Sequence, residues 1–144
     1  MTEWPKEIRK DHVYGNFKKP RGEKRRTNSK KREQRAGNSK AHLALLRLMP
    51  CCVTLMMPGG QVHHLKSGEA KAERGAAMRA SDRWGVPISH DAHMNLESVG
   101  ARGERRWFRE RGIENPHALA AALWANTGDL PRMIKVLMAH RGKA

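Results

Sequence analysis

Four residues in the middle of the chain carry side chains that could bind a divalent cation or move a proton. His63 and His64 are adjacent, and His93 is followed four positions later by Glu97. On a helix, a spacing of four places two side chains on the same face, about one turn apart. One imidazole of the adjacent pair could bind a metal ion while the other acts as a base. The pattern therefore predicts metal-dependent hydrolysis of a phosphodiester.

A strong positive charge accompanies these residues and indicates a polyanionic partner. The net charge is +15, and the first 40 residues contain fourteen Lys and Arg against five Asp and Glu. Segment 1–40 has too little apolar surface to offset the entropy of ordering, so we expect a disordered arm. Clustered charge of one sign favours contact with nucleic-acid phosphates over the alternative of a solubilising tail. The residues expected to make this contact are Lys18, Lys19, Arg21, Lys24, Arg25, Arg26, Lys30, Lys31 and Arg32.

The cysteines and the hydropathy pattern predict a soluble, cytoplasmic protein. Cys51 and Cys52 are adjacent and are the only cysteines of the sequence, which argues against a disulfide-stapled secreted scaffold. No apolar run approaches the ~20 residues of a membrane span, so no membrane association is expected. The N-terminal residues lack the apolar core of a signal peptide.

The histidine pair is expected at the end of a β-hairpin. Segment 41–49 is apolar and precedes Pro50, which predicts a short helix that ends there. Segments 51–55 and 61–65 are predicted strands, joined by a turn at residues 58–60. The pair of histidines would then lie on the second strand of the hairpin.

The second pair of candidate residues is expected on a helix that follows a long connection. Segment 66–81 is rich in Gly, Ala, Lys and Arg and is predicted to be a long, mobile loop with at most a helical turn. Segment 82–88 is predicted to be extended. Segment 91–99 is predicted to be a helix that carries His93 and Glu97.

The C-terminal part is predicted to be helical. A charged helix is expected over residues 104–111. Asn115, with a proline directly after it, should start the next helix, which covers residues 118–124. Asp129 precedes the last helix. The fold class is therefore α+β, with an arm at 1–40, a core at 41–112 and a helical extension at 113–144.

Four segments, in this order, resemble the HNH, or ββα-metal, nucleases. They are residues 48–54, 62–65 and 74–88, and the pair His93 and Glu97. The similarity is greatest to a phage- and prophage-encoded subset typified by the RecA-dependent Ref nucleases, and it covers about residues 41–112. The resemblance implies a small ββα-metal core and endonuclease activity on DNA.

The resemblance also implies a role for each candidate residue. His63 and His93 would be metal ligands, and His64 would be the general base. Glu97 stands where such proteins usually have a histidine, and a carboxylate there favours one Mg²⁺ or Mn²⁺ ion over Zn²⁺. Asp82 falls near the family's central Asn or Asp, which braces the loop behind the base.

The same comparison bears on zinc, partners and origin. Many relatives have cysteines just before the ligand helix, whereas this chain has Ser89 and Ala92, so a structural zinc site is not supported. The expected partner is DNA, either free, single-stranded or coated by a RecA-type recombinase filament. The expected location is the cytoplasm of a bacterial host that carries a phage or prophage.

Two other functions remain open from the sequence. The first is a non-catalytic, nucleic-acid-binding accessory protein built on a decayed HNH core. Glu97 distinguishes it from a nuclease: if Glu97 cannot complete a metal site, the core serves only as a scaffold. The second is an RNA- or ribosome-associated basic protein, which predicts preference for RNA and indifference to metal. A lone histidine pair is more often a surface feature than a metal site, so the nuclease hypothesis depends on all four residues together.

Overall fold

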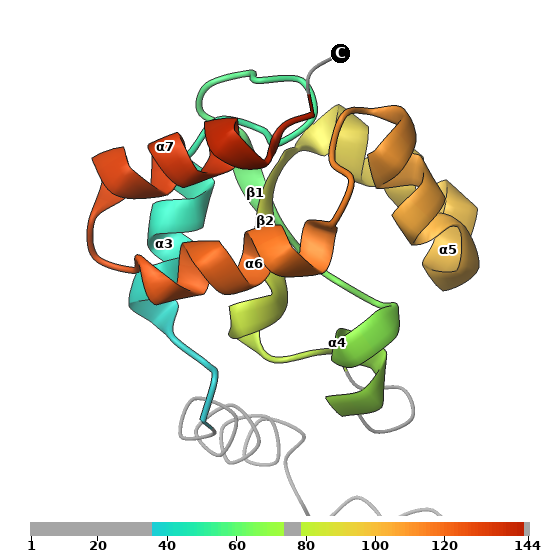
Figure 1. Ribbon diagram of the computed structural model, residues 1–144, viewed down its shortest axis with the longest axis horizontal. Coiled ribbons are helices and arrows are strands. Elements are labelled where there is room, and N and C mark those ends of the chain that lie inside the picture. The colour runs from blue at the N-terminus through green and yellow to red at the C-terminus, as the bar shows by residue number, and fades with distance from the viewer. Residues whose placement is uncertain (1–35, 74–78, 143–144) are drawn as a thin grey trace, which may run out of the picture. The chain divides into compact units, whose positions relative to one another are not determined.

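Two antiparallel strands and a set of helices form the part of the chain that the structure, a computed structural model, describes: residues 36–73 and 79–142 (Figure 1). The fold class is α+β, as predicted. In chain order the elements are α3 (Lys40–Leu48), β1 (Gly60–His64), α4 (Gly68–Glu73), the 3-10 helix η1 (Asp82–Trp84), β2 (Gly85–Ser89), α5 (His90–Glu110), α6 (Pro116–Ala125) and α7 (Leu130–His140).

The sheet consists of β1 and β2, which pair in antiparallel fashion with His64 opposite Gly85 at one end. Strand β1 matches the predicted strand 61–65, but its partner is not the predicted strand 51–55. The hairpin predicted around residues 58–60 is therefore wrong. The two strands are joined instead through α4 and η1, so the pairing spans a much longer connection.

Segment 51–55 forms a tight turn because its backbone groups bond locally. The Leu55 N–H donates to the Cys51 carbonyl, and the Cys51 N–H donates to the Met56 carbonyl, both at 2.9 Å. Leu55 has φ +60°, which an extended strand does not allow. Strand β2 takes the expected partner's place, and its residues are buried throughout. Such a strand shows no alternation of apolar and polar residues, which makes it hard to recognise from sequence.

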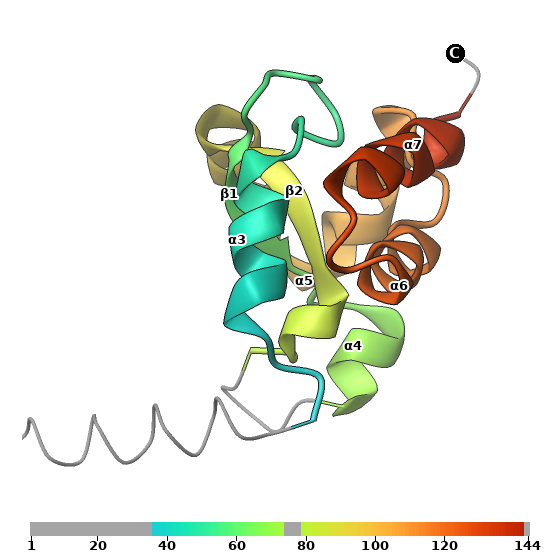
Figure 2. The ribbon, with the colours of Figure 1, turned by 90° about the vertical axis from the view of Figure 1, so that its left-hand side faces the viewer.

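Helix α3 confirms the predicted helix 41–49 and packs against both strands (Figure 2). Its start is fixed by Ser39, whose side chain accepts a hydrogen bond from the His42 N–H at 3.1 Å. Leu46 is fully buried in the core. A capped helix with one apolar face therefore covers the sheet.

Helix α5 contains both of the predicted helices 91–99 and 104–111. Ser89 starts it by accepting a hydrogen bond from the Ala92 N–H. The two parts are separated at Gly100, whose φ of 68° and ψ of −175° are accessible almost only to glycine. The break divides the ligand-bearing first part from the second part of α5.

The connection between the strands is more structured than predicted. Segment 66–81 is predicted to be a loop with at most a helical turn, and it contains the six-residue helix α4. Segment 82–88 was expected to be extended, and it begins instead with η1 before β2 continues it. Asp82 is the first residue of η1 and is buried.

Helices α6 and α7 confirm the predicted C-terminal helices. Asn115 caps α6 by accepting from the Ala118 N–H, and Asp129 caps α7 by accepting from the Arg132 N–H. Helix α6 packs against η1 and β2, so the predicted extension contacts the predicted core. Among the described residues, no helix has the length and apolar character needed to span a bilayer.

Candidate metal centre

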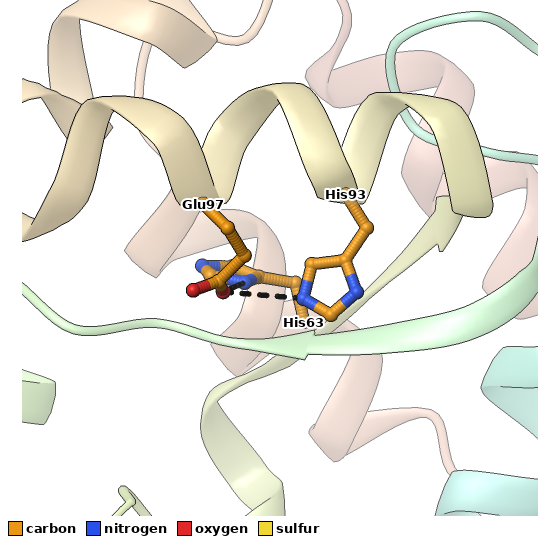
Figure 3. A group of neighbouring side chains, drawn as sticks. All are labelled: His63, His93 and Glu97. Atoms are coloured by element: carbon orange, nitrogen blue, oxygen red, sulfur yellow. Dashed lines mark ion pairs between the residues drawn. The ribbon is translucent and has the colours of Figure 1, made fainter.

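Three side chains from two elements converge on one point, as Figure 3 shows. His63 comes from β1, and His93 and Glu97 come from the first part of α5. One potential ligand atom from each lies within 4.8 Å of the others. The Glu97 Oε1 atom is 3.6 Å from His63 Nδ1 and 3.3 Å from His93 Nε2. The structure therefore brings together all three residues predicted to be ligands.

His63 is held by a carboxylate on the side away from this cluster. Its Nε2 atom is 2.9 Å from the Oε2 atom of Glu104, and both side chains are almost fully buried. A carboxylate accepts hydrogen bonds, so Nε2 is the ring nitrogen that donates to Glu104, and Nδ1 is the nitrogen that faces Glu97 and could bind an ion. Metal-bound histidines commonly have such a carboxylate behind them, which fixes the ring and raises its basicity.

Glu104 is a functional candidate that the sequence analysis missed. It accepts hydrogen bonds from the Lys66 N–H, the Ser67 N–H and the Ser67 hydroxyl, the last at 2.7 Å. Burial would raise the pKa of Glu104, but the hydrogen bonds from His63 and Ser67 outweigh it and lower that pKa. The break at Gly100 separates Glu104 from the ligand-bearing part of α5, so helical periodicity does not reveal its role.

His93 is oriented by the side chain of Gln61. Its Nδ1 atom is 2.9 Å from Gln61 Oε1, while the Gln61 amide nitrogen is 2.9 Å from the Nδ1 atom of His90. The Nε2 atom of His93 is therefore the one that faces Glu97. Burial and the neighbouring His63 lower the pKa of His93, which favours the neutral imidazole that a metal ion requires.

Glu97 joins the histidines on one side and a lysine on the other. Its Oε2 atom forms an ion pair with Lys66 Nζ at 2.5 Å. The hydrogen bond from Lys66 is the largest effect on the Glu97 carboxyl, and it lowers the pKa of that group. The carboxylate is therefore ionised at neutral pH and can supply a negatively charged oxygen ligand.

His64 and Asp82, the two predicted catalytic residues, also contact each other. The Nε2 atom of His64 lies 2.9 Å from Asp82 Oδ1. The other carboxylate oxygen accepts from the Ser39 N–H at 3.0 Å, and the Asp82 N–H donates to the Asn38 side chain. Asp82 therefore fixes the imidazole of His64 and also binds the residues that precede α3.

The three-residue cluster and the His64–Asp82 pair lie on opposite faces of β1. Successive side chains of a strand point to opposite faces. Gln61 and His63 point toward α5 and contact its residues. His64 points to the other face, where Asp82 connects it to Ser39 at the start of α3. The structure thus pairs His64 with Asp82 on one face of β1 and places the three predicted ligands on the other.

The donor set fits a divalent cation. Two imidazole nitrogens and one carboxylate oxygen suit ions that accept both nitrogen and oxygen ligands, such as Mn²⁺. Glu97 and His93 are partly exposed, at 39% and 27%, whereas His63 is 2% exposed. One side of the cluster is therefore open to solvent, and this opening leaves room for water or substrate oxygens.

The nine basic residues between positions 18 and 32 that were predicted to bind nucleic acid lie outside the described residues.

Comparison of the chain with protein-family models, with curated proteins and with solved structures finds no match. The features that bear on function are therefore the geometry of the site, the charge of the sequence and the resemblance of its motifs.

Proposed function

We propose that this protein is a metal-dependent endonuclease of the HNH type that hydrolyses DNA phosphodiester bonds. The observation that carries the proposal is the cluster of His63, His93 and Glu97, with both histidines oriented by separate hydrogen-bond acceptors. Such second contacts are typical of built metal sites, because they select the tautomer that offers its lone pair to the ion. Surface side chains that lie close together by chance would not require such orienting hydrogen bonds.

The order of elements supports a ββα-metal core within the α+β fold. Strand β1 carries His63 and His64, β2 pairs with it, and α5 follows β2 directly with His93 and Glu97. In this proposal the connection through α4 and η1 is an insertion between the two strands. It supplies Asp82, which contacts His64.

In the proposed reaction, His63, His93 and Glu97 bind one Mg²⁺ or Mn²⁺ ion. Such an ion stabilises the charge that develops on the phosphate and on the leaving oxygen. His64, whose Nε2 atom is held by Asp82, would take the proton of the attacking water as the general base. Asp82 holds the ring in place and stabilises the imidazolium that forms, as a carboxylate does in other histidine-carboxylate pairs.

The charge of the chain supports DNA as the substrate. A net charge of +15 favours binding to a polyanion, and its concentration in the first 40 residues favours contact with the phosphate backbone. By resemblance, the substrate includes single-stranded DNA and DNA coated by a RecA-type filament, in the cytoplasm of a bacterium that carries the phage or prophage. Phage recombination or DNA processing is the biological setting that we propose.

Cleavage of plasmid and single-stranded DNA tests the proposal, with Mn²⁺ or Mg²⁺ compared with EDTA and with or without a recombinase filament. We expect metal-dependent cutting that is lost in His63→Ala, His93→Ala and His64→Ala. His140→Ala is the matched control, because His140 lies on α7 and is not among the cluster residues. A folded His64→Ala protein that cuts as fast as the wild type would refute the assignment of the base.

A non-catalytic DNA-binding protein is the second candidate, and the position of His64 favours it. The imidazole of His64 lies on the α3 face of β1, whereas the cluster lies on the α5 face. In that case the ion would only stabilise the fold. Calorimetric binding of Mn²⁺ that depends on His63, combined with DNA binding and no cleavage under any condition, would support this second candidate.

A further inference from the structure

Lys66 directly contacts one of the candidate metal ligands, Glu97. Its Nζ atom is 2.5 Å from the Oε2 atom of Glu97. The opposite oxygen of the same carboxylate faces His63 Nδ1 and His93 Nε2. One carboxylate is therefore shared between an ammonium group and the space that an ion would occupy.

The backbone of Lys66 is fixed while its side chain remains accessible. Its N–H donates to both oxygens of the buried Glu104, each at 3.0 Å, directly after β1 ends at His64. The side chain is 32% exposed. A lysine has a flexible stem and a compact charge, so the ammonium can move while the backbone stays in position.

Lys66 contacts the most exposed of the three candidate ligands. Glu97 and Lys66 are 39% and 32% exposed, whereas His63 is 2% exposed. A phosphate that approaches the exposed Glu97 carboxylate would therefore come close to the ammonium group of Lys66. A lysine at this point can neutralise a non-bridging phosphate oxygen.

We propose that Lys66 exchanges Glu97 for the phosphate of the DNA substrate when the metal ion binds. In the metal-free protein, Lys66 neutralises Glu97. When Glu97 becomes a ligand, its negative charge is shared with a dication, so the ammonium is released toward the incoming phosphodiester. This inference rests on the proposed nuclease function and assigns Lys66 to binding of the scissile phosphate.

The proposal predicts effects of opposite sign on metal binding and on cleavage. Lys66→Met keeps the length of the side chain and removes its charge. Breaking a partly exposed ion pair should make Mn²⁺ binding about two- to fivefold tighter. The rate constant for DNA cleavage at saturating Mn²⁺ should fall at least about tenfold, because one cation at the phosphate is lost.

The experiment combines titration calorimetry with Mn²⁺ in the absence of DNA and plasmid cleavage at saturating Mn²⁺. Lys66→Arg should retain most of the cleavage rate. Lys135→Met, which removes an exposed lysine of α7, controls for the loss of one positive charge from the protein. Thermal unfolding of each metal-free variant checks that the fold is intact.

Four outcomes are informative. Tighter Mn²⁺ binding with slower cleavage in Lys66→Met supports the proposal. Weaker binding, with a wild-type cleavage rate once Mn²⁺ is saturating, overturns it and makes Lys66 a residue that only orients Glu97. Unchanged binding and cleavage also overturn it, while leaving the nuclease function intact. A wild-type protein that binds no Mn²⁺ contradicts the proposed function itself.

Discussion

Replacement of Glu104 by glutamine should weaken both the fold and the metal site. The carboxylate has two oxygens, one bonded to His63 Nε2 and the other to the Ser67 hydroxyl, and both accept from the Lys66 N–H. Glutamine keeps the shape but replaces one oxygen by an NH₂ group. Whichever way the amide turns, a donor faces a donor in a site where Glu104 is 1% exposed.

The magnitude follows from these contacts. A buried donor left without its acceptor costs about 1–3 kcal/mol of the free energy of unfolding. If the NH₂ group faces His63, the ring must change tautomer, and its proton then points at the metal. Loss of such a supporting contact lowers metal affinity by about 10- to 100-fold. Urea denaturation measures the first effect, and titration calorimetry with Mn²⁺ measures the second.

The comparison needs a carboxylate that is replaced in the same way outside the site. Glu110→Gln provides it, because Glu110 is 54% exposed and forms a surface ion pair with Arg106. This control should change the free energy of unfolding by less than about 1 kcal/mol and leave Mn²⁺ affinity unchanged. Wild-type stability and wild-type Mn²⁺ affinity in Glu104→Gln would refute the argument that Glu104 orients His63.

Two further predictions concern pH and backbone conformation. Burial lowers the pKa of His42 from 6.5 to about 4, so the unfolded state takes up a proton more readily. The free energy of unfolding should therefore fall by about 1–3 kcal/mol between pH 6.5 and 4, and His42→Phe should flatten that slope in urea denaturation. Gly100→Ala should lower the free energy of unfolding by about 1–3 kcal/mol, because alanine is strained at φ 68° and ψ −175° although the space around it is open. Thermal unfolding that is unchanged in Gly100→Ala would contradict this.

The helices could be predicted because their signals are local. Ser39, Asn115 and Asp129 each accept the hydrogen bond that starts a helix, and Asn115 is followed by a proline at the first helical position. The pairing of β1 with β2 could not be predicted in the same way. A turn signal at residues 58–60 indicated a short hairpin, but strand pairing is decided by burial over long sequence distances.

The same difference between local signals and long-range contacts applies to the residues of the candidate site. The three predicted ligands lie together because helical spacing brings His93 and Glu97 to one face, and strand position adds His63. The groups that orient them, Glu104 and Gln61, could not be found, because each reaches its histidine only through the tertiary fold. A spacing rule identifies residues on one element, and it says nothing of contacts between elements.

The long connection between β1 and β2 makes the proposed ion a removable cross-link. Its ligands lie at positions 63, 93 and 97, on either side of that connection, so a bound ion would close a loop of about thirty residues. Metal cross-links that close long loops restrict the unfolded chain. Their contribution to the free energy of unfolding depends on the free concentration of the ion. Each tenfold increase in free ion above its dissociation constant would add about 1.4 kcal/mol to the free energy of unfolding. Availability of the ion would therefore set the lifetime of the folded protein in the cell as well as its chemistry.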